Sequence, residues 1–287
     1  MTDRTLETVV TGLVIPEGPR WHEGALWLSD IGGGRVLRVD VATYEVEVVT
    51  DAIGMPSGLG FLPGGDPIVV SMDEHKVYRL TPGGPKEHAD LGQYCSGMLN
   101  DMIVDDQGRA YVDANGTSFF SDDHPEEQTP DVLVLVTSDG KTKVVTEPMR
   151  GPNGVILTED GRTLISAESS AARLTAFDVQ SDGSLTNQRV FADCGTAPDG
   201  ICLDAEGAVW AAAPVTGEFL RVKEGGEISD RIPLDGRIAL ACVLGGPDRR
   251  TLFMMTAAPH DLGVLKVKKT DGAILKTQVS VPGAGRP

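Results

Sequence analysis

Ala197-Pro198-Asp199-Gly200 is the most informative stretch of the sequence, because its core of proline, polar residue and glycine occurs three more times. The other three copies are Pro16-Glu17-Gly18, Pro56-Ser57-Gly58 and Pro152-Asn153-Gly154. Each copy is followed by an apolar stretch, a turn that contains glycine, and a second apolar stretch. A short motif that returns together with its surroundings indicates an internal structural repeat, which has to be identified before any single motif is interpreted.

Two further, less regular copies complete a series of six. The polar position of the motif is occupied in turn by Glu17, Ser57, Asn100, Asn153, Asp199 and Cys242. Successive members are roughly 40 to 53 residues apart, which is the size of one four-stranded propeller blade. We therefore expect an all-β fold, a six-bladed β-propeller with four-stranded blades, in which residues 1–287 form one domain without a linker.

Short alternating stretches between the copies supply the remaining strands, for example 35–39 with 46–49 and 174–177 with 189–191. Residues 6–10 form a spare strand near the N-terminus. We expect this strand to complete the last blade, whose other strands would include 263–267 and 275–279. Such closure removes an open sheet edge that would otherwise invite pairing with another chain.

The composition of the chain limits its partners. A net charge of −17 and a pI near 4.6 would repel a phosphate backbone, so nucleic-acid binding is not expected. No apolar run reaches the length of a membrane span, and residues 1–16 lack the basic and apolar regions of a signal peptide. Four cysteines without CxxC spacing indicate reduced thiols: Cys95, Cys194, Cys202 and Cys242. We expect a cytoplasmic protein, a monomer or small homo-oligomer, that binds neither nucleic acid nor membrane.

The repeat position also carries chemistry, because the innermost strand of each blade lines the central channel of a propeller. Equivalent positions far apart in sequence, such as Glu17 and Asp199, then become neighbours around one axis. Two carboxylates at such a place would repel each other and be costly to desolvate. A divalent cation resolves that conflict, and carboxylate and amide oxygens suit hard ions such as Ca²⁺, Mg²⁺ or Mn²⁺. Taken singly, a polar residue between proline and glycine is more often a turn residue, and only the agreement of several repeats favours a ligand.

Several segments in this register resemble the senescence marker protein/gluconolactonase/luciferin-regenerating enzyme family, which includes regucalcin. They are 16–21 with 26–31, Asn100-Asp101, Gly151-Pro152-Asn153-Gly154, 173–178 and Ala197-Pro198-Asp199-Gly200. Each segment is short, but together they lie in order at blade spacing along nearly the whole chain.

The resemblance implies a site and a reaction. It implies a six-bladed propeller with one divalent ion bound by Glu17, Asn153 and Asp199, with Ca²⁺ as the first expectation and Zn²⁺, Mg²⁺ or Mn²⁺ as alternatives. Asn100 would lie beside the metal and contact water or substrate, and Asp199 would be the base that activates the attacking water. The typical reaction is metal-dependent hydrolysis of a lactone or a related ester. Three protein ligands leave coordination positions open, as in catalytic sites.

One position departs from the family pattern. Sugar-lactone members usually have an arginine two residues before the third-blade asparagine, where this chain has Met98. A flexible apolar side chain there favours a more apolar lactone or ester over a simple aldonolactone. We expect substrate contacts from Met98, Asn100, Asp101 and Ser57. The insertion 118–130 is expected to be either a solvated loop or a lid over the site.

Three function classes remain at this stage. The first is the metal-dependent lactonase or carboxylic ester hydrolase. The second is a non-catalytic propeller that binds a metal or another ligand, and the third is a protein-interaction propeller, which needs no polar ring. No G-x-S-x-G or H-E-x-x-H motif offers a different catalytic apparatus.

Overall fold

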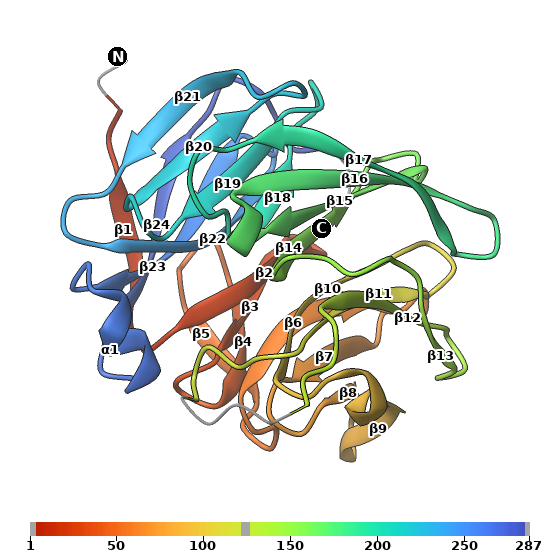
Figure 1. Ribbon diagram of the computed structural model, residues 1–287. Helices are drawn as coiled ribbons and strands as arrows, with labels where there is room; N and C mark the ends of the chain where they lie inside the picture. The colour runs from red at the N-terminus through yellow and green to blue at the C-terminus, as the bar shows by residue number, and fades with distance from the viewer. Residues whose placement is uncertain (1–3, 122–126, 285–287) are drawn as a thin grey trace.

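The computed structural model describes residues 4–121 and 127–284, and within them the strands form six four-stranded antiparallel sheets (Figure 1). The first two are β2 (Pro16–His22), β3 (Ala25–Asp30), β4 (Arg35–Val39) and β5 (Val46–Thr50), then β6 (Pro56–Phe61), β7 (Pro67–Ser71), β8 (Lys76–Thr81) and β9 (Gly84–Asp90). The next two are β10 (Met98–Val104), β11 (Ala110–Asn115), β12 (Val132–Val136) and β13 (Thr142–Val144), then β14 (Pro152–Leu157), β15 (Thr163–Glu168), β16 (Arg173–Val179) and β17 (Leu185–Asp193). The last two are β18 (Ile201–Leu203), β19 (Val209–Ala213), β20 (Glu218–Val222) and β21 (Ile228–Pro233), then β22 (Ile238–Gly245), β23 (Thr251–Ala258), β24 (Asp271–Gln278) and β1 (Glu7–Leu13).

The six sheets are the blades of a propeller. The first strand of each, β2, β6, β10, β14, β18 and β22, contacts the first strand of the next sheet, and β22 returns to β2. The predicted six-bladed β-propeller with four-stranded blades is therefore confirmed. Between neighbouring blades lie separate apolar clusters; one contains Tyr111 and Phe177, and another contains Trp210 and Phe219.

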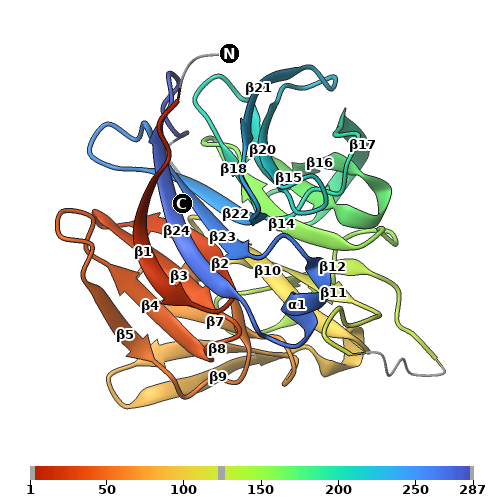
Figure 2. The same cartoon turned by 90° about the vertical axis from the view of Figure 1, so that its left-hand side faces the viewer.

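The N-terminal strand closes the ring, as predicted. Strand β1 pairs antiparallel with β24 as the outermost strand of the sixth blade, and Figure 2 shows the two side by side although they come from opposite ends of the chain. This pairing holds the first and last blades together and leaves β24 without an open edge.

One predicted strand is wrong. Residues 263–267 are not a strand, because Leu262–Lys266 form the short helix α1. Strand β23 ends at Ala258, and Pro259 has no N–H to donate to a ladder. The carboxylate of Asp261 then accepts a hydrogen bond from the Gly263 N–H and caps the first helical turn. A short apolar run fits either structure, and here β1 already occupies the place of the fourth strand.

No helix among the described residues is long and apolar enough to cross a membrane. The remaining helical elements in residues 4–121 and 127–284 are two single 3₁₀ turns, η1 (Gly92–Tyr94) and η2 (Ser169–Ala171). All four cysteines are buried and none forms a disulfide.

Candidate functional site

The repeated polar residues lie where the innermost strands depart from regular pairing. In β2 the pairing with β3 shifts between Glu17 and Arg20, and in β14 it shifts between Pro152 and Val155. Strands β6 and β10 shift at the matching place, β22 shifts earlier, between Ala239 and Ala241, and Asp199 precedes β18 directly. Such a bulge re-aims one side chain without breaking the sheet. In the first four blades the polar residue of the motif therefore lies at a strand bulge and not in a turn.

The glycine of the motif has a packing role at these bulges. A Cβ on Gly58 would lie 2.6 Å from the Met102 nitrogen, and a Cβ on Gly154 would lie 2.5 Å from the Asp199 carbonyl oxygen. Because real Cβ atoms do not approach so closely, only glycine lets the innermost strands of neighbouring blades meet here. This close approach is what brings the polar residues of the motif within reach of one another.

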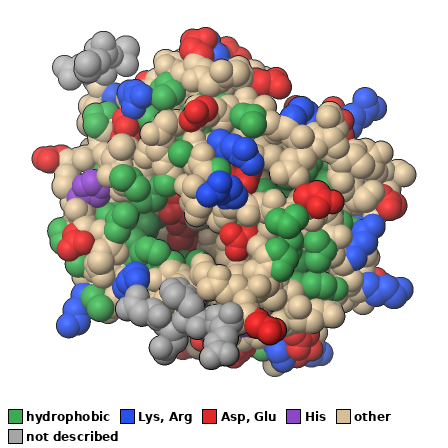
Figure 3. Space-filling view, viewed as in Figure 1, with side chains coloured by type: hydrophobic (Ala, Val, Ile, Leu, Met, Phe, Trp, Pro, Cys, Tyr) green, Lys and Arg blue, Asp and Glu red, His purple; other side chains and the backbone are tan. Residues whose placement is uncertain are grey.

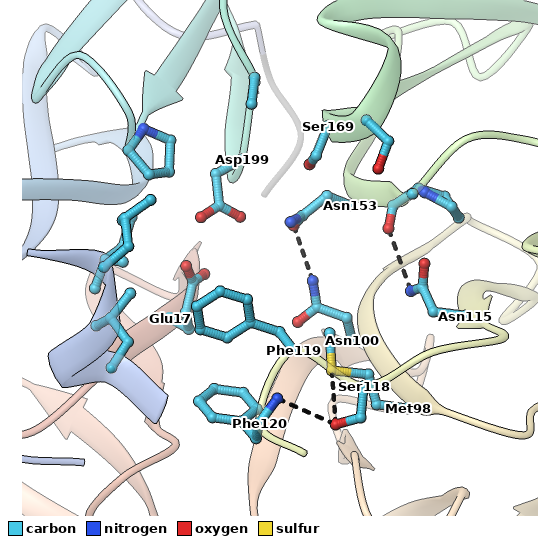
Figure 4. A pocket seen from close by; sticks show the side chains of 18 of the residues that line it. Glu17, Met98, Asn100, Asn115, Ser118, Phe119, Phe120, Asn153, Ser169 and Asp199 are labelled. Carbon is cyan, nitrogen blue, oxygen red and sulfur yellow. Dashed lines mark hydrogen bonds between the residues drawn. The ribbon is translucent and has the colours of Figure 1, made fainter. Parts of the chain in front are cut away.

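Four of the six repeat positions line one cavity of about 350 Å³: Glu17, Asn100, Asn153 and Asp199. In Figure 4 their side chains point toward a common space, with the two carboxylates facing each other. Figure 3 shows a hollow on this face of the molecule with acidic side chains in its depth. We call these four residues the floor of the cavity. The sequence register thus placed together residues that are up to four blades apart along the chain.

A chain of hydrogen bonds runs along the floor. The Ser57 hydroxyl donates to Asn100 Oδ1 at 3.0 Å, and Asn100 Nδ2 donates to Asn153 Oδ1 at 2.9 Å. The Asn153 side chain in turn donates to the carboxylate of Asp199. Rotating both amides by half a turn would reverse the chain, since a serine hydroxyl both donates and accepts. Asn153 Oδ1 would then face the carboxylates.

The two floor carboxylates hold protons tightly. Burial raises the pKa of Asp199 from 3.8 to about 7; the Asn153 hydrogen bond lowers the pKa, and the charge of Asp101 raises it. Burial and then the charge of Asp199 raise the pKa of Glu17 well above its ordinary value. The Glu17 carboxylate accepts a hydrogen bond from the Gly18 N–H, at 2.9 Å. Two buried carboxylates that face each other are stabilised in their charged form by a nearby positive charge.

A second layer of charged groups supports the floor from the side of the sheets. Arg20 is 4% exposed and donates to Asp101 Oδ1 at 2.8 Å and to the Met102 carbonyl. The Asp101 carboxylate also accepts from the Met102 and Val155 N–H groups, at 2.8 and 3.3 Å. Asp113, fully buried, accepts from the Asn100 N–H at 2.7 Å and from the Asp101 N–H at 3.1 Å. These bonds fix the backbone that carries Asn100.

The wall of the cavity is apolar on two sides. Phe119 and Phe120 follow β11 of the third blade and lie beside Met98 (Figure 4), while Leu262 and Leu265 belong to α1 after β23 of the sixth blade. The third and sixth blades are opposite each other in a ring of six. The wall is therefore built by the two segments that depart most from the repeat.

The remaining predicted residues lie elsewhere. Ser57 and Asp101 do not line the cavity; both support Asn100 from behind, and their predicted contact with substrate stays a prediction. Cys242, expected beside the pocket, turns away into the interface of the last two blades, where its sulfur is 3.7 Å from that of Cys202. Of the insertion 118–130, residues 122–126 lie outside the described residues, so the prediction of a lid is not decided.

Sequence reasoning missed Arg20, Asp113, the two phenylalanines and α1. Asp113 could have been identified from the sequence, because an acidic residue inside a strand that is expected to be buried must have hydrogen-bond or charge partners. Among the described residues, no group of three or more His, Cys, Asp or Glu side chains is arranged for a metal ion. The candidate ligand set instead combines two acids with one amide.

Comparison with known proteins places this geometry in a family. Residues 15–258 match the SMP-30/Gluconolactonase/LRE-like region. The chain belongs to this family. Among curated members it is 26% identical to 6-deoxy-6-sulfogluconolactonase of Pseudomonas putida, over 99% of this chain and 98% of that protein. It is 27% identical to pentonolactonase XacC of Haloferax volcanii, over 97% and 95%, and 26% identical to regucalcin of Xenopus laevis, over 90% and 88%.

Solved structures agree on the fold. A calcium-binding protein, regucalcin, of Agrobacterium tumefaciens superimposes with a TM-score of 0.80 at 20% identity, covering 99% of this chain and 97% of that chain. The gluconolactonase XC5397 of Xanthomonas campestris superimposes with a TM-score of 0.76 at 23% identity, covering 98% and 91%. This member of the family thus has the family's propeller, and relatives named as lactonases match it over nearly its whole length.

Proposed function

We propose that this protein is a metal-dependent hydrolase that opens a lactone or a related ester with water, with Asp199 as the general base. The observation that carries the proposal is the floor of the cavity. Two facing acids and two amides are gathered there from four blades, at the bottom of a hollow that a small molecule can enter. The lactonase names of the curated relatives favour the same reaction.

The donor set fits a hard divalent ion. Glu17, Asn153 and Asp199 would hold it, because they offer oxygen ligands only, once the Asn153 amide presents its oxygen. Calcium is our first choice on that chemistry, with Zn²⁺, Mg²⁺ and Mn²⁺ as alternatives. When bound, such an ion polarises the ester carbonyl and makes water more acidic.

The side chains of the floor divide the remaining work. Asp199 takes the proton of the attacking water. Its side chain can reach that water because it is half-buried and lines the cavity. Asn100 orients water or the substrate carbonyl, and its own position is fixed by Ser57 and Asp113. Water adds to the carbonyl carbon, the ring C–O bond breaks, and the leaving oxygen takes a proton to give a hydroxy acid.

The test is hydrolysis of a lactone panel by metal-free protein and by protein reconstituted with each ion. We expect turnover that chelator abolishes and metal restores. Asp199→Asn should lower kcat by about 10³-fold or more, the scale lost with a catalytic base and a metal ligand together. Glu224→Gln, which alters an exposed carboxylate, is the matched control and should retain full activity.

Two results would contradict the proposal. Turnover that survives both chelator and Asp199→Asn would exclude the mechanism. A melting temperature that depends on metal, without hydrolysis of any lactone or ester, would assign the protein to the alternative class of non-catalytic metal-binding propellers.

A further inference from the structure

We infer that the substrate is an uncharged lactone or ester with an apolar body, alkyl or aryl, and not a polyhydroxylated or anionic one. This inference rests on the proposed hydrolase function, because it names the substrate class of the same site. It is carried by the whole wall of the cavity and not by Met98 alone.

The wall of the cavity offers no positive side chain to an anionic substrate. Within the described chain, no lysine, arginine or histidine lines the cavity, and its two ionisable side chains are the acids Glu17 and Asp199. Lys266 of α1 does not line it either; its ammonium group lies 5.8 Å from the centre of the Phe119 ring. A carboxylate, sulfonate or phosphate on the substrate would therefore meet no positive side chain on the wall.

Three of the five polar side chains of the wall are already engaged in hydrogen bonds, which disfavours a sugar. Asn115 Nδ2 donates to the Pro152 carbonyl at 3.3 Å, and the Ser169 hydroxyl donates to the Pro198 carbonyl at 2.6 Å. The Ser118 hydroxyl accepts from the Phe120 N–H at 3.2 Å and contacts the Met98 sulfur at 3.8 Å. Several hydroxyls of a sugar that enters such a wall would lose their hydrogen bonds to water and find few new partners.

The apolar side chains, in contrast, form one continuous surface. Met98, Phe120 and Leu262 pack against the same hydrophobic cluster, to which Leu265 and Met72 belong. This cluster spans the cavity between the third and sixth blades. An alkyl or aryl group placed on it would be removed from water on two sides, which is the main source of binding for apolar ligands.

The volume sets the size of that group. A cavity of about 350 Å³ is near the lower end of small-molecule pockets. It suits one lactone ring that carries a short alkyl chain or is fused to one aryl ring. The carbonyl would lie at the polar floor, with the chain on the apolar wall.

The experiment compares four δ-lactones on the metal-reconstituted protein: δ-valerolactone, δ-nonalactone, dihydrocoumarin and glucono-δ-lactone. After the uncatalysed rate is subtracted, we expect kcat/KM for δ-nonalactone to exceed that for δ-valerolactone by about 10- to 100-fold, because each buried methylene adds up to about four-fold. Dihydrocoumarin should also be preferred over the unsubstituted ring. Glucono-δ-lactone hydrolysed as well as δ-nonalactone, or better, would overturn the inference and leave the hydrolase function intact.

A charge placed in the wall sharpens the test. Met98→Arg should lower kcat/KM for δ-nonalactone by about 10-fold, since it desolvates a cation against an alkyl chain. Val267→Arg is the matched control, because it adds the same charge at a residue that is 60% exposed just after α1. Equal effects of the two variants on δ-nonalactone would contradict the assignment of the wall.

Binding of lactams that resist hydrolysis tests the apolar cavity independently of the proposed hydrolase function. If no lactone is hydrolysed, the hydrolase proposal fails, and calorimetry with the matched lactams, which resist hydrolysis, still tests the cavity. The butyl-substituted lactam binding most tightly would support an apolar ligand. Gluconolactam binding more tightly, or none of the lactams binding, would overturn it.

Discussion

The floor and the wall of the cavity are built in different ways. The floor residues come from the same position of four blades, where Glu17, Asn100 and Asn153 lie at strand bulges and Asp199 directly precedes β18. The two apolar sides of the wall come mainly from an insertion after β11 and from a helix after β23. The regular part of the fold therefore positions reactive groups, while the irregular parts shape what can reach them.

The two regions also differ in how strongly the fold depends on them. Behind the floor lies a buried ion pair, Arg20 with Asp101, whose charged groups are 5% and 10% exposed. At the wall, Phe119 is 39% exposed and packs edge-on against Phe120, with ring centres 5.4 Å apart. Changes near the floor should thus cost stability, and changes at the wall should mainly alter the choice of substrate.

The largest effect on stability is expected for Arg20→Met. The substitution leaves the Asp101 carboxylate buried without its cation, which costs about 3–5 kcal/mol in the free energy of unfolding. Arg38→Met in the same blade is the control, because the Arg38–Glu47 pair is 3.5 Å long and exposed and should be worth at most about 1 kcal/mol. Urea denaturation of the metal-free proteins measures both.

A double variant distinguishes the effect of an unpaired buried charge from the effect of altered side-chain packing. Arg20→Met combined with Asp101→Leu removes both charges, and we expect it to recover a large part of the lost stability, because no unpaired charge stays buried. An Arg20→Met protein as stable as Arg38→Met would show that the pair does not support the floor.

The sequence was sufficient for the floor because the propeller is a closed repeat. Once the copies at Glu17, Asn153 and Asp199 were in register, closure of the ring dictated that they meet, whatever the details of each blade. The direction of neighbouring side chains was not dictated in this way. Asp101 follows Asn100 directly, and at a bulge the next side chain points back into the sheets, where it meets Arg20.

The wall could not be predicted for a related reason. The run at 263–267 is apolar in a pattern that suits a short strand or a short helix, and only the arrival of β1 at the last sheet decides between them. Phe119 and Phe120 lie in an insertion with no repeat to give their register. Met98 was the one wall residue within reach of sequence reasoning, because it stands at a fixed distance from a repeat position.

A smaller effect is expected from pH in the metal-free protein. Asp199, with its pKa raised by burial from 3.8 to about 7, binds a proton in the folded state that the unfolded chain releases. Its contribution to stability is complete at acidic pH and is lost as the pH rises from about 4 to about 7. Metal affinity should rise over the same range, because the ligand must lose its proton.

Urea unfolding in chelator at a series of pH values tests this linkage. Asp199→Asn should flatten the fall in stability, whereas Glu224→Gln, at an exposed position, should leave it unchanged. Stability of the metal-free protein that increased over this range, or an equal slope in Asp199→Asn, would show that the floor acids are not held protonated.

The smallest effect on stability is expected at the wall. Phe119→Ala removes a ring that lies in front of the floor in Figure 4 but is partly exposed, so the free energy of unfolding should change by about 0.5 kcal/mol or less. KM for δ-nonalactone should nevertheless rise about 5-fold with kcat nearly unchanged, because the ring contributes equally to binding substrate and transition state. Val190→Ala, at a residue that is 57% exposed on β17, should change neither quantity. A fall in kcat without a change in KM would place Phe119 with the reactive floor instead, and the division between a floor that reacts and a wall that selects would no longer hold.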